Sequence, residues 1–290
     1  MQEINYTFII PHHNCPDLLD RCLNSIPQRD DIQIIVVDDN SAEDKKPIEN
    51  GRAEVEYIYI SKEESKGAGR ARNKGLEKAK GKWLLFPDAD DYYSDGFMDI
   101  LDKYKEDNID VLYFNFTYLD GETGYVLPDL KIQQYIASFT GKKKASDYIR
   151  YCNKTPWTKM VRSEFVMANQ MHFEETPNGN DILFSMWVAH KCEKYKVINE
   201  RLYNYVKTPG SIVTQKKSPE AYLFTLIHLL QVNYILQCIG HKEWKNSFIL
   251  HLCAYIRRYP IVNSSKLLFL LLMNSKKILT KRKEWMSVFS

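Results

Sequence analysis

The chain has 290 residues, 44% of them hydrophobic, so it can bury a full core as one large domain or as one domain with an appendage. Its longest apolar run, LLFLLLM at 267–273, is far below the roughly 20 residues that span a bilayer, which argues against a membrane-spanning segment. The six cysteines include no CxxC pair and no zinc-type spacing with histidine, which argues against a disulfide framework and a structural metal site.

The formal net charge of +3 is unevenly divided along the chain. Residues 216–290 hold 12 Lys and Arg against three acids, leaving 28 against 34 upstream, so the tail carries +9 and the rest −6. Such an asymmetry often marks a segment that faces anionic lipid or another polyanion. The N-terminus, MQEINYTFIIPHHN, has no basic region before a long apolar stretch, so we expect no secretory signal and a cytoplasmic protein.

The first 120 residues alternate between strand-like and helix-like segments. Between the strand-like runs lie helical stretches such as PDLLDRCLNSI, 16–26, with apolar residues at helical spacing. This alternation predicts an α/β domain with a largely parallel sheet and helices on both faces. Beyond residue 120 the pattern loosens, and 219–256 is expected to be mainly helical and packed in a bundle or against the first domain. The apolar or β-branched runs of strand length are 6–10, 32–37, 55–60, 83–86 and 111–116.

Polar clusters follow three of the predicted strands. PHHN follows the first, DDNS the second and DADD the fourth. In an open α/β sheet, ligands bind beyond the carboxyl ends of the strands, so these segments should meet in one crevice.

The DADD cluster is a candidate cation site. In an extended segment Asp88 and Asp90 would lie on the same side, about 6–7 Å apart, where they could share one hydrated cation and the phosphates it carries. Mg²⁺ or Mn²⁺ fits such oxygen ligands. An ordinary acidic turn is the alternative, and a DxD pattern alone is weak evidence.

Two further clusters favour a nucleotide. In VVDDNS, Asp38 or Asp39 could accept hydrogen bonds from a base or ribose, or the cluster could only cap the next turn. In SKGAGRARNKGLEKAKG, 65–81, glycines lie among Arg70 and Arg72, whose guanidinium groups would suit phosphates or a base. The alternative for this second segment is a glycine-rich loop that leads into a solvated basic helix.

Taken together, FIIPHHN, VVDDNS, GAGRARNKGL and LLFPDADD resemble glycosyltransferase family 2 in their order and spacing. PWTKMVRSEFVMANQMHFEETPNGNDILFS and RLYNYVKTPGSIV are similar to later blocks of its bacterial surface-polysaccharide members. The resemblance covers about 4–215 and implies the glycosyltransferase A fold, a Rossmann-like, mostly parallel sheet flanked by helices. It also implies a transferase domain at 1–215, followed by a basic helical extension at 216–290.

The activity that the resemblance implies is inverting transfer of a sugar from a nucleotide diphosphate sugar to an acceptor hydroxyl in polysaccharide or glycolipid biosynthesis. UDP is favoured by family frequency, and Mn²⁺ or Mg²⁺ would stabilise the leaving diphosphate. By resemblance, the site residues are Pro11 at the start of the nucleotide pocket, Asp39 at the base, Arg72 in the ARN element, Asp88 at the ribose, Asp90 on the metal and Asp91 beside the acceptor or donor sugar.

Asn180 and Asp181 match the family's Glu-Asp pair. Asp181 would be the general base that takes the acceptor's hydroxyl proton. By the same resemblance Asn180, like Asp91, would lie beside the acceptor or donor sugar, but it departs from the usual acid, which puts the role of this first position in doubt. His12 and His13 also depart, from Val-Tyr, and either tune nucleotide selection or are structural.

Several alternatives stay open. Asn180 and PHHN favour a second hypothesis, a catalytically inactive nucleotide-sugar-binding or scaffold subunit of a glycan assembly complex. The basic segment 264–289 could be an interfacial helix that meets an anionic membrane and a lipid-linked acceptor, or a bundle or oligomer contact. Segment 205–217 could close over the diphosphate or be a surface crossover, and Trp157 could stack on a sugar or anchor the core. We expect no nucleic-acid partner, and the oligomeric state is open.

Overall fold

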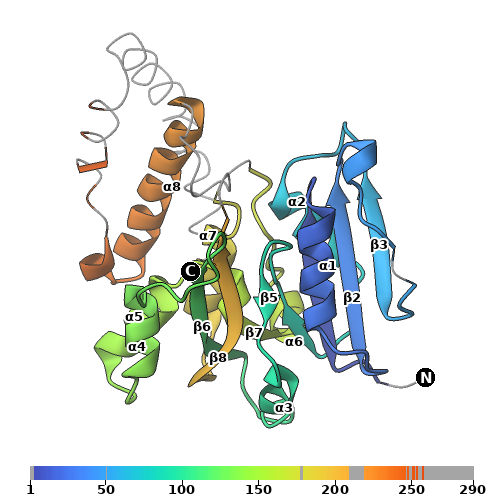
Figure 1. Cartoon of the computed structure of the whole chain (residues 1–290). Helices are drawn as coiled ribbons and strands as arrows, with labels where there is room; N and C mark the ends of the chain where they lie inside the picture. Colours follow the sequence, from blue (N-terminus) through green and yellow to red (C-terminus); the bar gives the residue numbers. More distant parts are fainter. Residues whose placement is uncertain are drawn as a thin grey trace.

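The computed structural model describes residues 3–49, 51–176, 179–208 and 219–245, together with Ser247, Leu250, His251, Cys253 and Arg257. Its strands are β1 (Tyr6–His12), β2 (Ile32–Asp39), β3 (Val55–Ile60), β4 (Trp83–Leu85), β5 (Tyr92–Tyr93), β6 (Val111–Asp120), β7 (Lys159–Arg162) and β8 (Tyr195–Lys207). They form one eight-stranded sheet in the order β3-β2-β1-β4-β7-β6-β8-β5 (Figure 1).

Helices cover both faces of this sheet (Figure 1). The α-helices are α1 (Pro16–Ser25), α2 (Ala68–Leu76), α3 (Phe97–Leu101), α4 (Lys131–Ala137), α5 (Lys143–Tyr151), α6 (Ser163–Ala168), α7 (Ile182–Lys191) and α8 (Pro219–Cys238). Three short 3-10 helices are η1 (Glu43–Lys45), η2 (Pro156–Thr158) and η3 (Lys242–Trp244).

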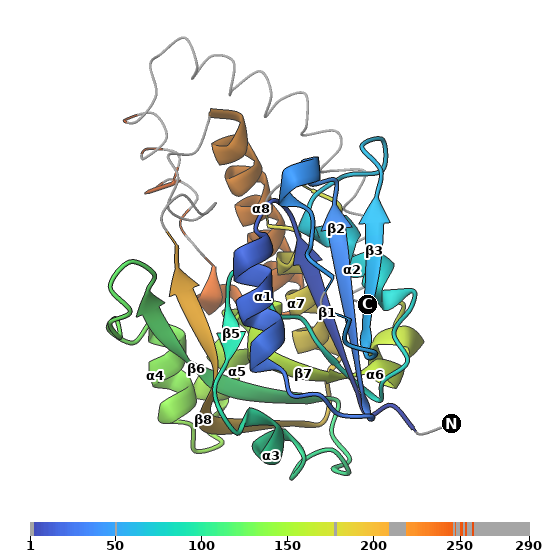
Figure 2. The same ribbon diagram turned by 45° about the vertical axis from the view of Figure 1, so that its right-hand side comes forward.

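The half of the sheet that carries the nucleotide-type motifs is parallel. β1 pairs in parallel with β2 and β4, and β2 pairs in parallel with β3. Every residue of β2 is buried, as expected for a parallel strand covered on both faces. The carboxyl ends of β1, β2 and β3 point to one edge (Figure 2), which confirms the predicted α/β architecture. The sequence did not predict β5, β7 or β8. β5 and β7 run antiparallel to their neighbours, and β8 pairs in parallel with β6.

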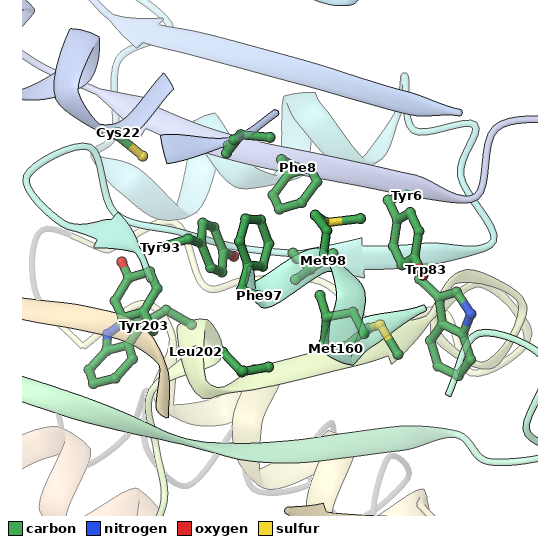
Figure 3. Close-up of a cluster of buried hydrophobic side chains, with 14 of the residues drawn as sticks. Tyr6, Phe8, Cys22, Trp83, Tyr93, Phe97, Met98, Met160, Leu202 and Tyr203 are labelled. Carbon is green, nitrogen blue, oxygen red and sulfur yellow. The ribbon is translucent and has the colours of Figure 1, made fainter. Parts of the chain in front are cut away.

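Successive side chains of β1 divide the core into two layers. Phe8 belongs to a cluster with Leu19 of α1 on one face, and Ile9 belongs to a cluster with Phe184 of α7 on the other. Figure 3 shows the first layer, in which the Phe8 ring lies edge-on to Phe97 with centroids 6.1 Å apart. This alternation is the two-residue period of a strand, and it fixes which side chains of β1 face each helix layer.

The described part of the C-terminal region packs onto the sheet-flanking helices. Val232 and Ile235 of α8 share a buried cluster with Met186 of α7 and Tyr151 of α5. The prediction of helix is therefore confirmed for 219–238, whereas the predicted domain boundary at 215 and the segment 264–289 lie outside the described residues. No helix among the described residues is both long and apolar enough to cross a membrane.

Candidate active site

Asp39, the last residue of β2, has one carboxylate oxygen held by the protein and one that is not. Its Oδ2 accepts a 2.8 Å hydrogen bond from the backbone N–H of Gly67, while its Oδ1 is buried with no partner among the described residues. Leaving a buried acceptor unpaired costs about 1–3 kcal/mol. Asp39 Oδ1 is therefore an acceptor available to a ligand N–H or O–H.

His12, the last residue of β1, is a structural histidine by its contacts. Its Nε2 accepts from the backbone N–H of Cys15 at 3.3 Å, so Nδ1 carries the proton and donates to Asp38 Oδ1 at 2.7 Å. The Ser41 hydroxyl donates to the same carboxylate oxygen at 2.5 Å. These bonds satisfy His12 and Asp38 inside the protein and tie the end of β1 to the loop after β2.

His13 and Pro11 border the same crevice. His13 is exposed, and its Nδ1 donates to the main-chain oxygen of Asp39 at 2.9 Å. Pro11 lies in β1 opposite Val37 of β2 and is half-buried. The departure from Val-Tyr therefore places an imidazole directly beside the residue that we expect at the base.

The carboxylates of Asp88, Asp90 and Asp91 each offer one oxygen within 4.8 Å of the others. Burial, and then the charge of Asp88, raise the pKa of Asp90 to about 6. Mutual repulsion of this kind is relieved by a cation, and an all-carboxylate donor set is the chemistry that Mg²⁺ and Mn²⁺ prefer. The residues present therefore fit the divalent ion that the sequence predicted.

Asp91 is engaged by β8. It is 1% exposed, its Oδ1 accepts from the backbone N–H of Val206 at 2.7 Å, and its Oδ2 accepts from the Tyr203 hydroxyl at 2.9 Å. Tyr203 Oη in turn accepts from the backbone N–H of Asp88 at 3.0 Å. Asp91 thus anchors the DADD loop to β8, and direct contact of Asp91 with a sugar stays a prediction that this burial does not favour.

Arg72 connects the DADD loop with the Asn180–Asp181 pair. Its Nη2 donates to Asp88 Oδ1 at 2.5 Å and its Nη1 donates to Asn180 Oδ1 at 2.9 Å. Arg72 is 4% exposed, and its guanidinium group lies over the Phe173 ring, 5.3 Å from the centroid. A planar guanidinium has this fork of donors, so one residue fixes both segments.

Two glycines allow α2 to approach closely enough for this contact. A Cβ on Gly69 would lie 2.0 Å from the main-chain oxygen of Glu174, and one on Gly75 would lie 2.3 Å from Cγ2 of Ile9. The backbone of α2 therefore lies directly against β1 and against the segment that precedes Asn180. The GAGRARNKG pattern is a packing requirement as well as a candidate phosphate loop.

Asp181 lies immediately before α7 and close to the same charges. Burial raises the pKa of its carboxyl group; Arg72 lowers this pKa, Asp88 raises it, and Lys159 lowers it. Its neighbour Asn180 binds Arg72, which also binds Asp88, so Asp181 lies next to this bridge although it is far from both residues in sequence. The role of Asp181 as the general base stays a prediction.

A family model described as "Glycosyl transferase family 2" matches residues 7–167. The chain belongs to glycosyltransferase family 2. The matched span includes Asp39, Arg72 and Asp90, and it ends before Asp181. The assignment of Asp181 as the base is therefore supported by its position in the structure and by the sequence resemblance, and not by this match.

Curated relatives and solved structures agree with this family. The uncharacterized glycosyltransferase EpsJ of Bacillus subtilis is 24% identical over 217 residues, which cover 71% of this chain and 62% of EpsJ. The poly(ribitol-phosphate) β-N-acetylglucosaminyltransferase TarS of Staphylococcus aureus is 26% identical over 242 residues, 80% of this chain and 41% of TarS. The crystal structure of S. aureus TarS 1–349 in complex with UDP-GlcNAc superposes with a TM-score of 0.63 at 20% identity over 90% of this chain and 83% of that one, which shows the shared fold.

Trp157, which the sequence left as either a sugar-stacking residue or a core anchor, lies in the core. It is 5% exposed and stacks on Tyr203 and Tyr205, with ring centroids 5.0 and 5.2 Å away. Its contacts are those of a core anchor. Lys207 ends β8, whereas Gly210 and the rest of the predicted closing segment lie outside the described residues.

Sequence reasoning missed two basic residues at the site. Arg21 of α1 donates from Nη2 to the main-chain oxygen of Asp90 at 2.5 Å and lies over the Tyr92 ring. Lys159 is fully buried and donates from Nζ to the main-chain oxygens of Asn153 and Thr155; burial lowers its pKa to about 7. In sequence, Arg21 looks like a solvated residue of an amphipathic helix, so no signal marked it. Lys159 could have been found, because a lysine within the largely apolar run PWTKMV indicates a buried charge.

Proposed function

We propose that this chain transfers a sugar from a nucleotide diphosphate sugar, with UDP as the nucleotide, to a hydroxyl group of a glycan or lipid-linked acceptor, with inversion at the anomeric carbon. The observation that carries the proposal is the Arg72 bridge, which brings Asp88 and Asn180 to one site although they belong to different segments. The ligand in the TarS complex, UDP-GlcNAc, supports a UDP-sugar donor.

In this proposal the parallel edge of the sheet binds the donor. Asp39 Oδ1, buried and unpartnered within the described chain, accepts a hydrogen bond from the base. Asp88 contacts the ribose through the oxygen that Arg72 leaves available. Pro11 and His13 form the wall of the pocket beside the base.

Asp90 would hold Mn²⁺ or Mg²⁺, which when bound neutralises charge on the leaving diphosphate. Arg21 holds the main chain at Asp90 and so orients this carboxylate. Arg72 and Asn180 keep the DADD loop and Asp181 in fixed relation.

Asp181 accepts the proton of the acceptor hydroxyl as the oxygen attacks the anomeric carbon. The new bond joins that oxygen to the anomeric carbon, while the bond to the diphosphate oxygen breaks and its electron pair leaves with the nucleoside diphosphate. One displacement on the face opposite the leaving group inverts the configuration. The raised pKa of Asp181 favours uptake of this proton.

The domain division at 215 and 216 is part of the same proposal, with residues 216–290 as a basic helical extension. Its charge of +9 supports contact with an anionic membrane surface, where a lipid-linked acceptor would be found. As part of the same proposal, we expect the protein to be cytoplasmic and to act at the inner face of the membrane.

The proposal is tested by turnover with a panel of UDP- and GDP-sugars in the presence of Mn²⁺, using lipid-linked and free glycan acceptors. Transfer from at least one UDP-sugar with inverted product configuration is the expected result. The alternative, an inactive nucleotide-sugar-binding subunit, is motivated by Asn180 in place of an acid. Binding of UDP and Mn²⁺ without turnover of any donor would favour that alternative.

A further inference from the structure

A cavity of about 600 Å³ lies between α4, α5 and η3, away from the candidate active site. Its lining residues come from α4 (Lys131 and Tyr135), from α5 and from η3 (Trp244). Figure 1 shows α4 and α5 beyond β6 and β8, on the other side of the molecule from β1, β2 and β3. The volume is within the range of about 300–1,000 Å³ that is typical of ligand pockets.

Three lysines give this cavity an excess of positive charge at its rim. Lys131, Lys143 and Lys144 line it and are exposed, and none has a carboxylate within 4.0 Å among the described residues. The two acids of the lining, Asp147 and Glu243, both lie beside His241, with oxygens 3.8 and 3.5 Å from its Nδ1. Lys131 Nζ lies over the Tyr148 ring, 5.1 Å from its centroid. Three lysines against these two acids leave the lining with one excess positive charge.

Aromatic rings form the apolar part of the cavity. Tyr135 stacks on Tyr148 with ring centroids 4.0 Å apart, and Trp244 lies edge-on to Tyr148 at 5.3 Å. The Trp244 Nε1–H is buried and has no acceptor among the described residues. Rings packed against one another in this way are rigid, and a half-buried Trp offers both a flat face and an N–H donor.

Flat aromatic faces, carboxylates and ammonium groups together match a charged sugar. A pyranose ring packs its C–H face on an aromatic ring, its hydroxyl groups donate to carboxylates, and a phosphate or carboxylate substituent binds ammonium groups. A nucleotide would find no glycine-rich backbone here, and a purely neutral sugar would leave the lysines unpaired. We propose that this cavity is a binding subsite for an anionic glycan segment, one that carries phosphate or carboxylate groups.

The position of the cavity relates it to the reaction, a step that rests on the proposed function. α5 carries Lys143 and Lys144 and packs against α7, whose first residue follows Asp181. Because the cavity lies away from the candidate active site, an acceptor polymer held there would have to extend along α5 and α7 to present its reacting end to the proposed base. The subsite would then select charged polymers as acceptors and hold them between transfers.

The test measures binding of the full chain to size-matched oligomers by calorimetry, without any donor. The probes are a glycerol-phosphate oligomer, a carboxylated hyaluronan hexasaccharide and neutral maltohexaose. We expect at least one anionic probe to bind about tenfold or more tightly than the neutral one, with an affinity that falls as salt is added. The two anionic probes distinguish phosphate from carboxylate as the recognised group.

The variant K131Q/K143Q/K144Q is expected to weaken anionic binding about tenfold or more and to leave binding of UDP with Mn²⁺ unchanged. The matched control K45Q/K78Q/K103Q removes the same charge from exposed lysines on other segments and should bind as the parent does. Equal loss in both variants would mean non-specific attraction and would overturn the proposal. Trp244→Leu should weaken binding of every sugar probe that occupies the cavity.

Two other results would also overturn the subsite. One is an anionic affinity that survives the triple lysine variant, and the other is glycan binding only when Mn²⁺ is added, which would make Asp147, His241 and Glu243 a cation site. Because binding is measured without donor, a failure of sugar transfer in a separate assay would count against the proposed function and not against the subsite.

Discussion

Arg72 and Asn180, separated by 108 positions in the chain, are joined by a 2.9 Å hydrogen bond from Nη1 to Oδ1. The other arm of the same guanidinium group binds Asp88. Asn180 thus holds, as a neutral acceptor, the place where the family resemblance expects an acid. We infer from this bond that Asn180 positions Arg72.

Replacing Asn180 should show this positioning role. Asn180→Leu removes the acceptor and leaves a buried Arg72 N–H unpaired, a cost of about 1–3 kcal/mol, so we expect transfer to slow by about tenfold or more. Asn180→Asp keeps an acceptor in place and should stay within a few-fold of the parent. Transfer rates at saturating donor measure both variants, and a fully active Leu variant would remove the bridge from the account.

Gly69→Ala should unfold more easily because its Cβ would lie 2.0 Å from the main-chain oxygen of Glu174. We expect the free energy of unfolding to fall by about 1–3 kcal/mol, as for overpacking in a core, together with weaker binding of UDP. Gly141→Ala is the control, since Gly141 has φ of +79° but open space around its Cβ position, which limits the loss to backbone strain of about 1 kcal/mol. Urea denaturation measures the free energy of unfolding of both variants. Equal losses of this free energy would show that α2 does not pack tightly against the main chain at Glu174.

Asp90 predicts a specific pH dependence of cation binding. Burial and the charge of Asp88 raise its pKa to about 6. The folded, metal-free protein therefore holds a proton on Asp90 that the unfolded chain has already lost, and this proton stabilises the fold. The stabilisation is lost as the pH rises through about 6. Mn²⁺ requires the ionised carboxylate, so the rise in Tm on adding Mn²⁺ should be large at about pH 7.5 and small at about pH 5.

Two variants check this assignment by thermal melting. Asp90→Asn should abolish the rise in Tm with Mn²⁺, whereas Asp95→Asn, an exposed acid close by in sequence, should retain it. The same rise at both pH values in the parent, or a rise retained by Asp90→Asn, would show that the cation binds elsewhere.

Site residues that directly follow a parallel strand could be predicted from the sequence. Asp39 and Asp90 could be assigned to one edge because polar clusters after parallel strands meet there, and the structure brings both loops to that edge. The bond between Arg72 and Asn180 could not be derived, because it depends on how closely α2 packs against a distant loop.

β8 explains why the surroundings of Asp91 and Trp157 were harder to predict. The β8 sequence, YKVINERLYNYVK, has no clean alternation of polar and apolar residues. The strand also pairs with β6 through a shifted register, so no regular two-residue pattern marks it as a strand. Tyr203 of this strand binds Asp91 and stacks on Trp157. With the strand in place, Trp157 is part of the core and Asp91 is hydrogen-bonded to β8, while contact of Asp91 with a sugar stays a prediction.

The central claim is that Asp181 removes the acceptor proton at the site that Arg72 and Asp88 form. The most direct measurement is single-turnover transfer by Asp181→Asn, combined with calorimetry of UDP and Mn²⁺ and with Asp99→Asn, an exposed acid, as the control. We predict a transfer rate lower by about 10²–10⁴-fold with nucleotide affinity unchanged, and a control that behaves as the parent. Transfer by Asp181→Asn at the parent rate would contradict the account.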